Sequence, residues 1–193
     1  MQDLMLTGST RKKFRICSPE TKRMKQGTVS VLFGCHNIVH SLYVLWAWVI
    51  LYDARPKWWQ FICIMIHDVG HWGKQYLDDE KQKAEHWMLG ARWAKKLYGQ
   101  KGYDFVAGHT SQSGCILSML HKADKYAWYI TPTWVIWLNA LIEPKLRMGY
   151  TRIEGARRFK EQVRKTIESG EYGSVHKMYM ERCIEANKIT GGK

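Results

Sequence analysis

The sequence predicts an all-α fold, and two observations support this prediction. From Val29 onward the chain alternates apolar helical segments with short breaks, and no run alternates apolar and polar residues for long enough to indicate a strand. Proline and glycine occupy the breaks, where proline lacks a backbone donor and glycine suits the end of a helix. These residues are Pro56, Gly99, Gly102, Pro132, Pro144 and Gly170.

We expect helices at about residues 29–52, 57–69, 82–98, 103–111, 114–130, 132–142, 151–169 and 174–188. Pro56 separates the first two, and Pro132 separates the fifth from the sixth. The first helix contains the longest apolar run, Leu42 to Tyr52, which is far shorter than the ~20 residues of a membrane-spanning helix. We therefore expect this helix in the core.

The 193 residues fit one domain, in which three parts differ in composition. Residues 1–27 are polar and basic without a sustained period, and we expect a mobile N-terminal arm or lid. Residues 28–148 are expected to form the core of the domain. Residues 149–193 contain amphipathic, basic helices, which we expect to pack on the same domain as a cover or as an interaction surface.

The charge balance and the cysteines limit the partners and the compartment. A net charge of +13 favours anionic partners, which include nucleotides, nucleic acids and anionic membrane surfaces. The five cysteines are widely spaced and form no short metal-binding or redox motif, so we interpret them as reduced thiols. The start of the chain does not resemble a secretory signal. We therefore expect a cytoplasmic protein, whose oligomeric state stays open.

Ten tryptophans are an unusual number for this length. Several lie in or beside apolar segments, where an indole ring can be buried if its N–H finds an acceptor. These are Trp46, Trp48, Trp58, Trp59, Trp134 and Trp137. We interpret them as core residues, with base stacking by one or two of them as the alternative.

The dipeptide His67-Asp68 follows the apolar segment Phe61 to Ile66. An ionised carboxylate is costly to bury unless it is paired or bound to a metal, so Asp68 needs a partner. A divalent cation shared with the neighbouring imidazole would supply one. A helix cap or a buried hydrogen-bonded pair is the alternative for this dipeptide alone.

Further histidines and a second aspartate strengthen the metal interpretation. His40 begins an apolar helix upstream, and His86, His109 and Asp124 lie beside apolar helical segments downstream. Helical bundles build metal sites from imidazole and carboxylate groups that converge from several helices. Any one of these residues could be an ordinary core or surface residue, but the ordered set predicts a metal site.

The chain resembles the HD-domain superfamily of metal-dependent phosphohydrolases. The resemblance covers roughly half the chain, from His40 to Tyr129, and rests on His40-Ser41-Leu42, on Ile66 to His71, and on Leu117 to Lys125 with its Ala-Asp-Lys ending. It implies an all-α HD-domain bundle with a metal in its core. By resemblance, the ligands of that metal would be His40, His67, Asp68 and Asp124.

Two further segments are similar to the extra histidines of the dinuclear branch, and they contain His86 and His109. The resemblance then implies that Asp68 bridges two metals and that these histidines complete the second site. His71 departs from the cyclic-dinucleotide branch, which carries Lys there, and instead resembles the central motif of deoxynucleoside triphosphate triphosphohydrolases. Imidazole ligands favour one or two ions of manganese, iron, nickel, cobalt or zinc.

Residues next to the predicted metal site are candidates for catalysis and for phosphate binding. Asp68 and His71 are candidate catalytic residues, with His71 as the acid for the leaving oxygen because imidazole titrates near neutral pH. Lys74, also a catalytic candidate, and Lys125 are candidates to bind substrate phosphates, and solvated surface lysines are the alternative. His36 lies four residues before His40, on the same face of any shared helix, and could replace or assist it.

The predicted function is hydrolysis of a phosphate ester or anhydride bond in a dinucleoside polyphosphate, a cyclic oligonucleotide or a deoxynucleoside triphosphate. One alternative is an HD-type nuclease on single-stranded nucleic acid, which the net charge of +13 favours. Another is a catalytically silent nucleotide-binding module. The retained set of candidate ligands argues against a silent module.

Overall fold

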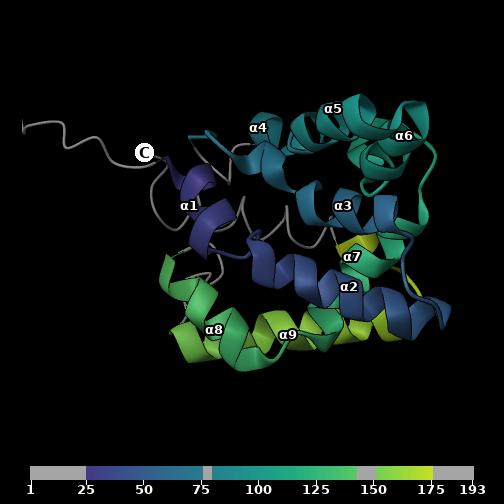
Figure 1. Ribbon diagram of the computed structural model, residues 1–193. Coiled ribbons are helices and arrows are strands. Elements are labelled where there is room, and N and C mark those ends of the chain that lie inside the picture. Colours follow the sequence, from purple (N-terminus) through teal and green to yellow (C-terminus); the bar gives the residue numbers. More distant parts are fainter. Residues whose placement is uncertain (1–24, 76–79, 143–150, 176–193) are drawn as a thin grey trace, which may run out of the picture.

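The computed structural model describes residues 25–75, 80–142 and 151–175, and within these ranges the regular elements are helical (Figure 1). In chain order they are α1 (Gln26–Phe33), α2 (Ile38–Tyr52), α3 (Trp58–Ile66), the 3-10 turn η1 (Val69–His71), α4 (Glu80–Ala84), α5 (Trp87–Tyr98), α6 (Gln100–Ala107), the 3-10 turn η2 (Ser111–Ser113), α7 (Met119–Ile130), α8 (Thr133–Ile142) and α9 (Arg152–Glu168). The prediction of an all-α fold is confirmed.

The helices form two packed groups that share α7. One core lies among α2, α3, α5, α6 and α7 and includes Val44, Ile64 and Leu120. The other lies among α7, α8 and α9 and includes Ile136 and Phe159. Figure 1 shows α5 and α6 on one side of the molecule and α8 and α9 on the opposite side, with α2 between them. Both groups therefore position α7, which carries Asp124.

The predicted helix at residues 29–52 is wrong in one respect, because α1 ends at Phe33 and α2 begins at Ile38. The side chain of Asn37 accepts hydrogen bonds from the backbone N–H groups of Val39 and His40, and so caps the start of α2. This break places His36 in the connection between α1 and α2, so the direction of its side chain does not follow the periodicity of either helix.

Other predicted boundaries also change. The expected helix at 82–98 is interrupted between α4 and α5 at His86, and the expected helix at 114–130 begins only at Met119. Gly114 adopts the left-handed region with φ 68°, so the chain turns there before α7. Residues 1–24 of the expected arm lie outside the described residues, while Gln26 and Gly27 belong to α1. Most of the expected helix at 174–188 also lies outside them.

The core interpretation of the tryptophans holds for some and is wrong for others. Trp48 is buried, whereas Trp46, Trp58 and Trp134 are 56%, 73% and 63% exposed. Trp46 and Trp48 lie on the same apolar helix, but residues two apart point in directions about 200° apart. Because only one side of α2 meets the core, Trp46 remains on the outside.

A lysine on α9 holds the C-terminal end of α7. The Lys160 ammonium donates hydrogen bonds to the backbone carbonyls of Trp128 at 3.0 Å, Thr131 at 2.8 Å and Tyr129. A cation suits the negative end of a helix dipole, and without Lys160 these carbonyl oxygens would lose a hydrogen-bond donor. This contact ties the C-terminal cover to the helix that supports the site.

Replacement of that lysine should destabilise the fold. Hydrogen bonds to charged groups contribute about 1.5–3 kcal/mol, so we expect Lys160→Met to lower the free energy of unfolding by about 2 kcal/mol in urea denaturation. Lys165→Met is the matched control, because Lys165 is exposed and pairs with Glu161 at 3.6 Å on the surface. Equal stability of the two variants would contradict the role given to Lys160.

Among the described residues, no single helix has the length and apolar character needed to cross a membrane. The pair α1 and α2 meets those criteria only when taken together, and the two helices meet at an angle of 54°.

Candidate metal centre

Histidine and aspartate side chains from separate elements meet in one pocket between the helices. They come from the α1–α2 connection, from α2, from the end of α3 and η1, and from α7 and the residues beside α5 and α6. These residues are His36, His40, His67, Asp68, His71, His86, His109 and Asp124. All of them are buried except His36, which is partly buried.

Three of these histidines share a local arrangement. The Nδ1 atoms of His67, His86 and His109 lie 2.6, 2.5 and 2.6 Å from the backbone carbonyl three residues earlier in each case. Because a carbonyl only accepts, each Nδ1 carries the proton and donates it. Nε2 of each ring is thereby the atom that faces the other side chains of the cluster, which is the orientation that metal-ligating histidines commonly have.

Asp68 lies at the centre, and its two carboxylate oxygens face different groups of histidines. Oδ2 lies 3.8 Å from His40 Nε2 and 3.4 Å from His67 Nε2. Oδ1 lies 3.9 Å from His86 Nε2 and 3.8 Å from His109 Nε2. The two oxygens of this carboxylate therefore face different imidazoles, and either group could hold a metal ion, as could Asp68 with His36 and His71.

Asp124 completes the first of these groups. Its Oδ1 lies 2.9 Å from His40 Nε2 and 3.5 Å from His67 Nε2. The Lys125 ammonium lies 2.5 Å from the other oxygen, Oδ2. Two carboxylate oxygens and two imidazole nitrogens thus surround the first position, and Lys125 balances part of the negative charge.

The second group fits a cation on chemical grounds. The Nε2 atoms of His86 and His109 are 2.9 Å apart, yet both rings already donate their Nδ1 protons to carbonyls. Two unprotonated nitrogens at this distance repel each other unless a cation or a proton lies between them. Burial lowers the pKa of His86 to about 4 and, together with His86, holds that of His109 well below its usual value, which disfavours a proton. The two Nε2 atoms would therefore be able to hold a shared metal ion together with Asp68.

The first group fits a cation as well. The Nε2 atom of His67 is buried and has no hydrogen-bond partner within the described part of the chain. Burial by itself lowers the pKa of His67, but the charges of Asp68 and Asp124 outweigh it and raise the pKa to about 9. Burial raises the pKa of Asp68, but His67 and His36 outweigh it and hold that pKa well below its usual range. In the metal-free protein, a proton on His67 therefore supplies the positive charge that a metal would otherwise supply.

The different pKa values of His67 and His86 predict how many protons each group releases when it binds a metal. At pH 7.5 the metal-free protein carries a proton on His67, whose pKa is about 9, but none on His86, whose pKa is about 4. Since a ligand must be deprotonated, we expect binding at the first group to release about one proton and binding at the second to release almost none. Calorimetric titration in buffers of different ionisation enthalpy measures this number. Release of protons by neither binding step would contradict the assignment.

No family model matches the chain, and neither a curated protein nor a solved structure shows detectable similarity to it. What the chain does must therefore be inferred from the site, because a helical fold by itself does not specify an activity.

The structure brings together most of the predicted site residues. The four first candidates, His40, His67, Asp68 and Asp124, form one group, and the two further histidines face the other oxygen of Asp68. His71 is buried and stacks between two imidazoles, with ring centroids 3.9 Å from His36 and 4.9 Å from His86. Lys125 lines the pocket.

Lys74 is placed differently from the other candidates. Its ammonium lies 3.6 Å from a carboxylate oxygen of Glu85, and Lys74 is not among the residues that line the pocket. Lys83 lines the pocket and is buried, although the sequence did not point to it. Lys83 lies three residues before the candidate ligand His86, and the backbone carbonyl of Lys83 accepts the Nδ1–H of His86. This spacing is the signal that could have indicated Lys83.

His36 lies at the site beside His40, so neither residue replaces the other. Its Nδ1 is 2.8 Å from Asp68 Oδ2, and the two rings come from different elements rather than from one helical face. The expected shared helix is wrong, because the chain bends before Asn37. His36 thus contacts the central carboxylate from the side that His71 also faces.

Two further residues complete the surroundings of the site. Trp128 lines the pocket, and its ring stacks on His40 with centroids 4.7 Å apart. His121 donates its Nδ1–H to the His109 carbonyl at 2.8 Å, and so supports the backbone that positions His109. The cavity among these residues is about 40 Å³, which is room for ions or a few water molecules.

Proposed function

We propose that this protein is a metal-dependent phosphohydrolase of the HD type, which cleaves a phosphate ester or anhydride bond of a nucleotide. One observation carries the proposal: Asp68 directs one oxygen to His40 and His67 and the other to His86 and His109. A carboxylate between two nitrogen-rich groups is the arrangement expected of a bridging ligand in a two-metal hydrolase.

The donor atoms favour borderline transition metals, so we propose one or two ions of manganese, iron, nickel, cobalt or zinc. When bound, such ions supply Lewis acidity, which provides hydroxide at neutral pH and stabilises charge on phosphate oxygens. His40, His67, Asp68 and Asp124 would hold the first, and Asp68 with His86 and His109 would hold the second.

The remaining polar residues of the pocket act on the substrate in this proposal. Lys125 and Lys83 line the pocket and would neutralise phosphate oxygens. His71 is 2% exposed and lies between two other imidazoles, so it would hold a proton for the leaving oxygen away from bulk water. Lys74, which pairs with Glu85 outside the pocket, is assigned no part in binding the phosphates.

The cavity at the site is about 40 Å³, which is much smaller than a nucleotide. In this proposal only the phosphate group to be cleaved enters it, and the rest of the substrate lies outside. Trp128 offers an aromatic face at the pocket wall, although that face already stacks on His40. Dinucleoside polyphosphates, cyclic oligonucleotides and deoxynucleoside triphosphates are the substrate classes to test.

A nuclease acting on single-stranded nucleic acid is the second candidate, and the net charge of +13 favours it. Exposed arginines on α9, including Arg157 and Arg164, would contact phosphates in that case. Binding of long strands would then fall steeply with salt, whereas a nucleotide hydrolase would bind them weakly at any salt concentration.

The test combines metal analysis with a substrate panel. The purified chain is loaded with each candidate metal and supplied with the three nucleotide classes and with single-stranded DNA, and released product is quantified by chromatography. We expect turnover of one nucleotide class with about two metals bound per chain. Turnover of DNA alone would favour the nuclease. Bound metal without turnover of any substrate would favour a silent binding module, and a chain that binds no metal would contradict the proposal.

A further inference from the structure

One side of α2 is apolar and uncovered among the described residues. The sequence contains no charged residue from Gln26 to Tyr52, although the chain as a whole carries a net charge of +13. Surface helices normally carry charged residues on their solvent side. The exposed residues of α2 are instead Ile38, Val39, Leu42, Trp46, Val49 and Ile50.

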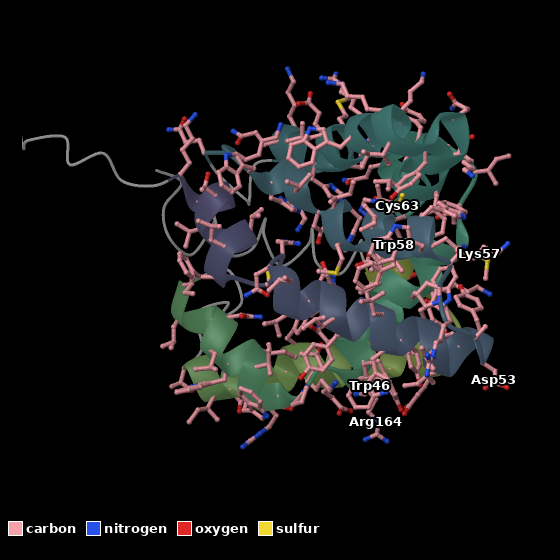
Figure 2. All side chains as sticks on the ribbon, viewed as in Figure 1. Trp46, Asp53, Lys57, Trp58, Cys63 and Arg164 are labelled. Carbon is pink, nitrogen blue, oxygen red and sulfur yellow. The ribbon has the colours of Figure 1, made fainter. Side chains whose placement is uncertain are left out.

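The apolar surface continues from α2 to α3. A groove between these helices is lined by Leu45, Val49, Arg55, Pro56, Trp58 and Phe61. The ring of Trp58 is 73% exposed and stacks on Phe61 with centroids 5.5 Å apart. Figure 2 labels Trp46 on α2 and Trp58 at the start of α3, with Lys57 and Asp53 toward the C-terminal end of α2. We call Ile38, Leu42, Trp46, Val49 and Trp58 the apolar face.

Basic residues border this face. Arg55 lines the groove beside Val49 and Trp58, and Lys57 is exposed immediately before α3. Asp53 is the acidic residue at the same edge, so the connection from Asp53 to Lys57 has a net positive charge. Tryptophan rings favour the boundary between lipid and water, and nearby basic side chains attract anionic headgroups.

We propose that the protein docks by the apolar face of α2 on the surface of a bilayer that contains anionic lipids. The helix would lie on the bilayer rather than cross it, because its other side is packed in the core through Val44, Ala47 and Trp48. Its 15 residues are also about 22 Å long, which is less than the hydrocarbon thickness.

Docking by this face leaves the candidate metal centre unobstructed. His40 is buried on the inner side of α2, and Leu42 lies about 200° around the same helix. The inference therefore does not depend on the proposed hydrolysis, and variants of the apolar face should leave metal binding unchanged. Hydrolysis next to a membrane surface would be its consequence if both proposals hold.

The test is cosedimentation of the full chain with vesicles of phosphatidylcholine, with and without phosphatidylglycerol. We expect binding to the anionic vesicles that weakens with salt, and much weaker binding to the neutral ones. A carboxylate on the apolar face must be desolvated to enter the lipid boundary, so Leu42→Glu and Trp46→Glu should each reduce vesicle binding at least about tenfold.

Matched controls place the same charge on other exposed apolar positions. Leu97 on α5 and Ile116 before α7 are 60% and 93% exposed, and Leu97→Glu and Ile116→Glu should bind vesicles as the wild type does. All four variants should have wild-type unfolding temperatures. The proposal is overturned if the wild type does not bind anionic vesicles. It is also overturned if Leu42→Glu dissociates a dimer in ultracentrifugation without reducing vesicle binding, since a second copy would then cover the face.

Discussion

Asp68→Asn is expected to abolish hydrolysis and to remove metal from both groups. The two oxygens of Asp68 face different pairs of imidazoles at 3.4–3.9 Å, so one substitution weakens both positions. Mutation of a residue that only supports a metal ligand lowers metal affinity or activity by about 10–100-fold. Mutation of a ligand shared by two metals should therefore lower them by more than about 100-fold. Asn keeps the size of the side chain, so the loss would come from the charge.

Two measurements check this expectation, the metal content of the purified variant and its rate of product release. Asp104→Asn is the matched control, because Asp104 is exposed and its side chain accepts a hydrogen bond from Gln100 on the surface of α6. His86→Ala gives an intermediate case, since it removes a ligand from the second group alone. Full activity and a full metal complement in Asp68→Asn would remove the basis of the proposed function.

The second large effect is expected from Gly70→Ala in η1. A Cβ atom at Gly70 would lie 1.4 Å from the carbonyl oxygen of His86, which is backbone and cannot rotate away. The chain must therefore move His86 away from the His67-Asp68 segment. Overpacking in a close-packed interior lowers the free energy of unfolding by about 1–3 kcal/mol. Because the clash at Gly70 is with backbone, we expect a loss of about 3 kcal/mol or more. We expect the unfolding temperature to fall by about 6 °C or more.

The same variant should lose metal from the second group, because His86 is one of its ligands. Calorimetry and metal analysis of Gly70→Ala test both consequences together. Gly173→Ala is the matched control, because a Cβ atom at Gly173 meets no atom within 4 Å. An unchanged unfolding temperature in Gly70→Ala would mean that the close approach of η1 to His86 is not required.

Several features of the site could be predicted because they depend on residue type and on local pattern. A histidine next to an aspartate after a buried apolar helix requires a partner for the carboxylate wherever the helix lies. The helical period also predicted which segments form helices, and α3, α8 and α9 begin or end within a few residues of the expected positions. Residue chemistry and local periodicity were therefore sufficient for the fold class, whereas the roles of the candidate ligands came from the resemblance to HD-domain proteins and stay predictions.

The sequence could not predict how the connections between helices position individual side chains. Gln26 to Tyr52 has a continuous apolar pattern without charge, yet the chain bends before Asn37 and brings His36 to Asp68. The sequence pointed to Lys74 as a phosphate ligand and not to Lys83, but of these two lysines Lys83 is the one that lines the pocket. These outcomes depend on the path of short connections, which local periodicity does not encode.

The amino-acid sequence by itself determined the helical class and the kinds of atoms available to a metal. Only the tertiary structure decided that the two oxygens of Asp68 face separate histidine pairs, and that Trp46 lies on an uncovered surface while Trp48 is buried. The physical reason is that secondary structure follows from interactions within a few residues. The distances between His40, Asp68 and His109, and the exposure of each side of a helix, depend on which other helices pack against it.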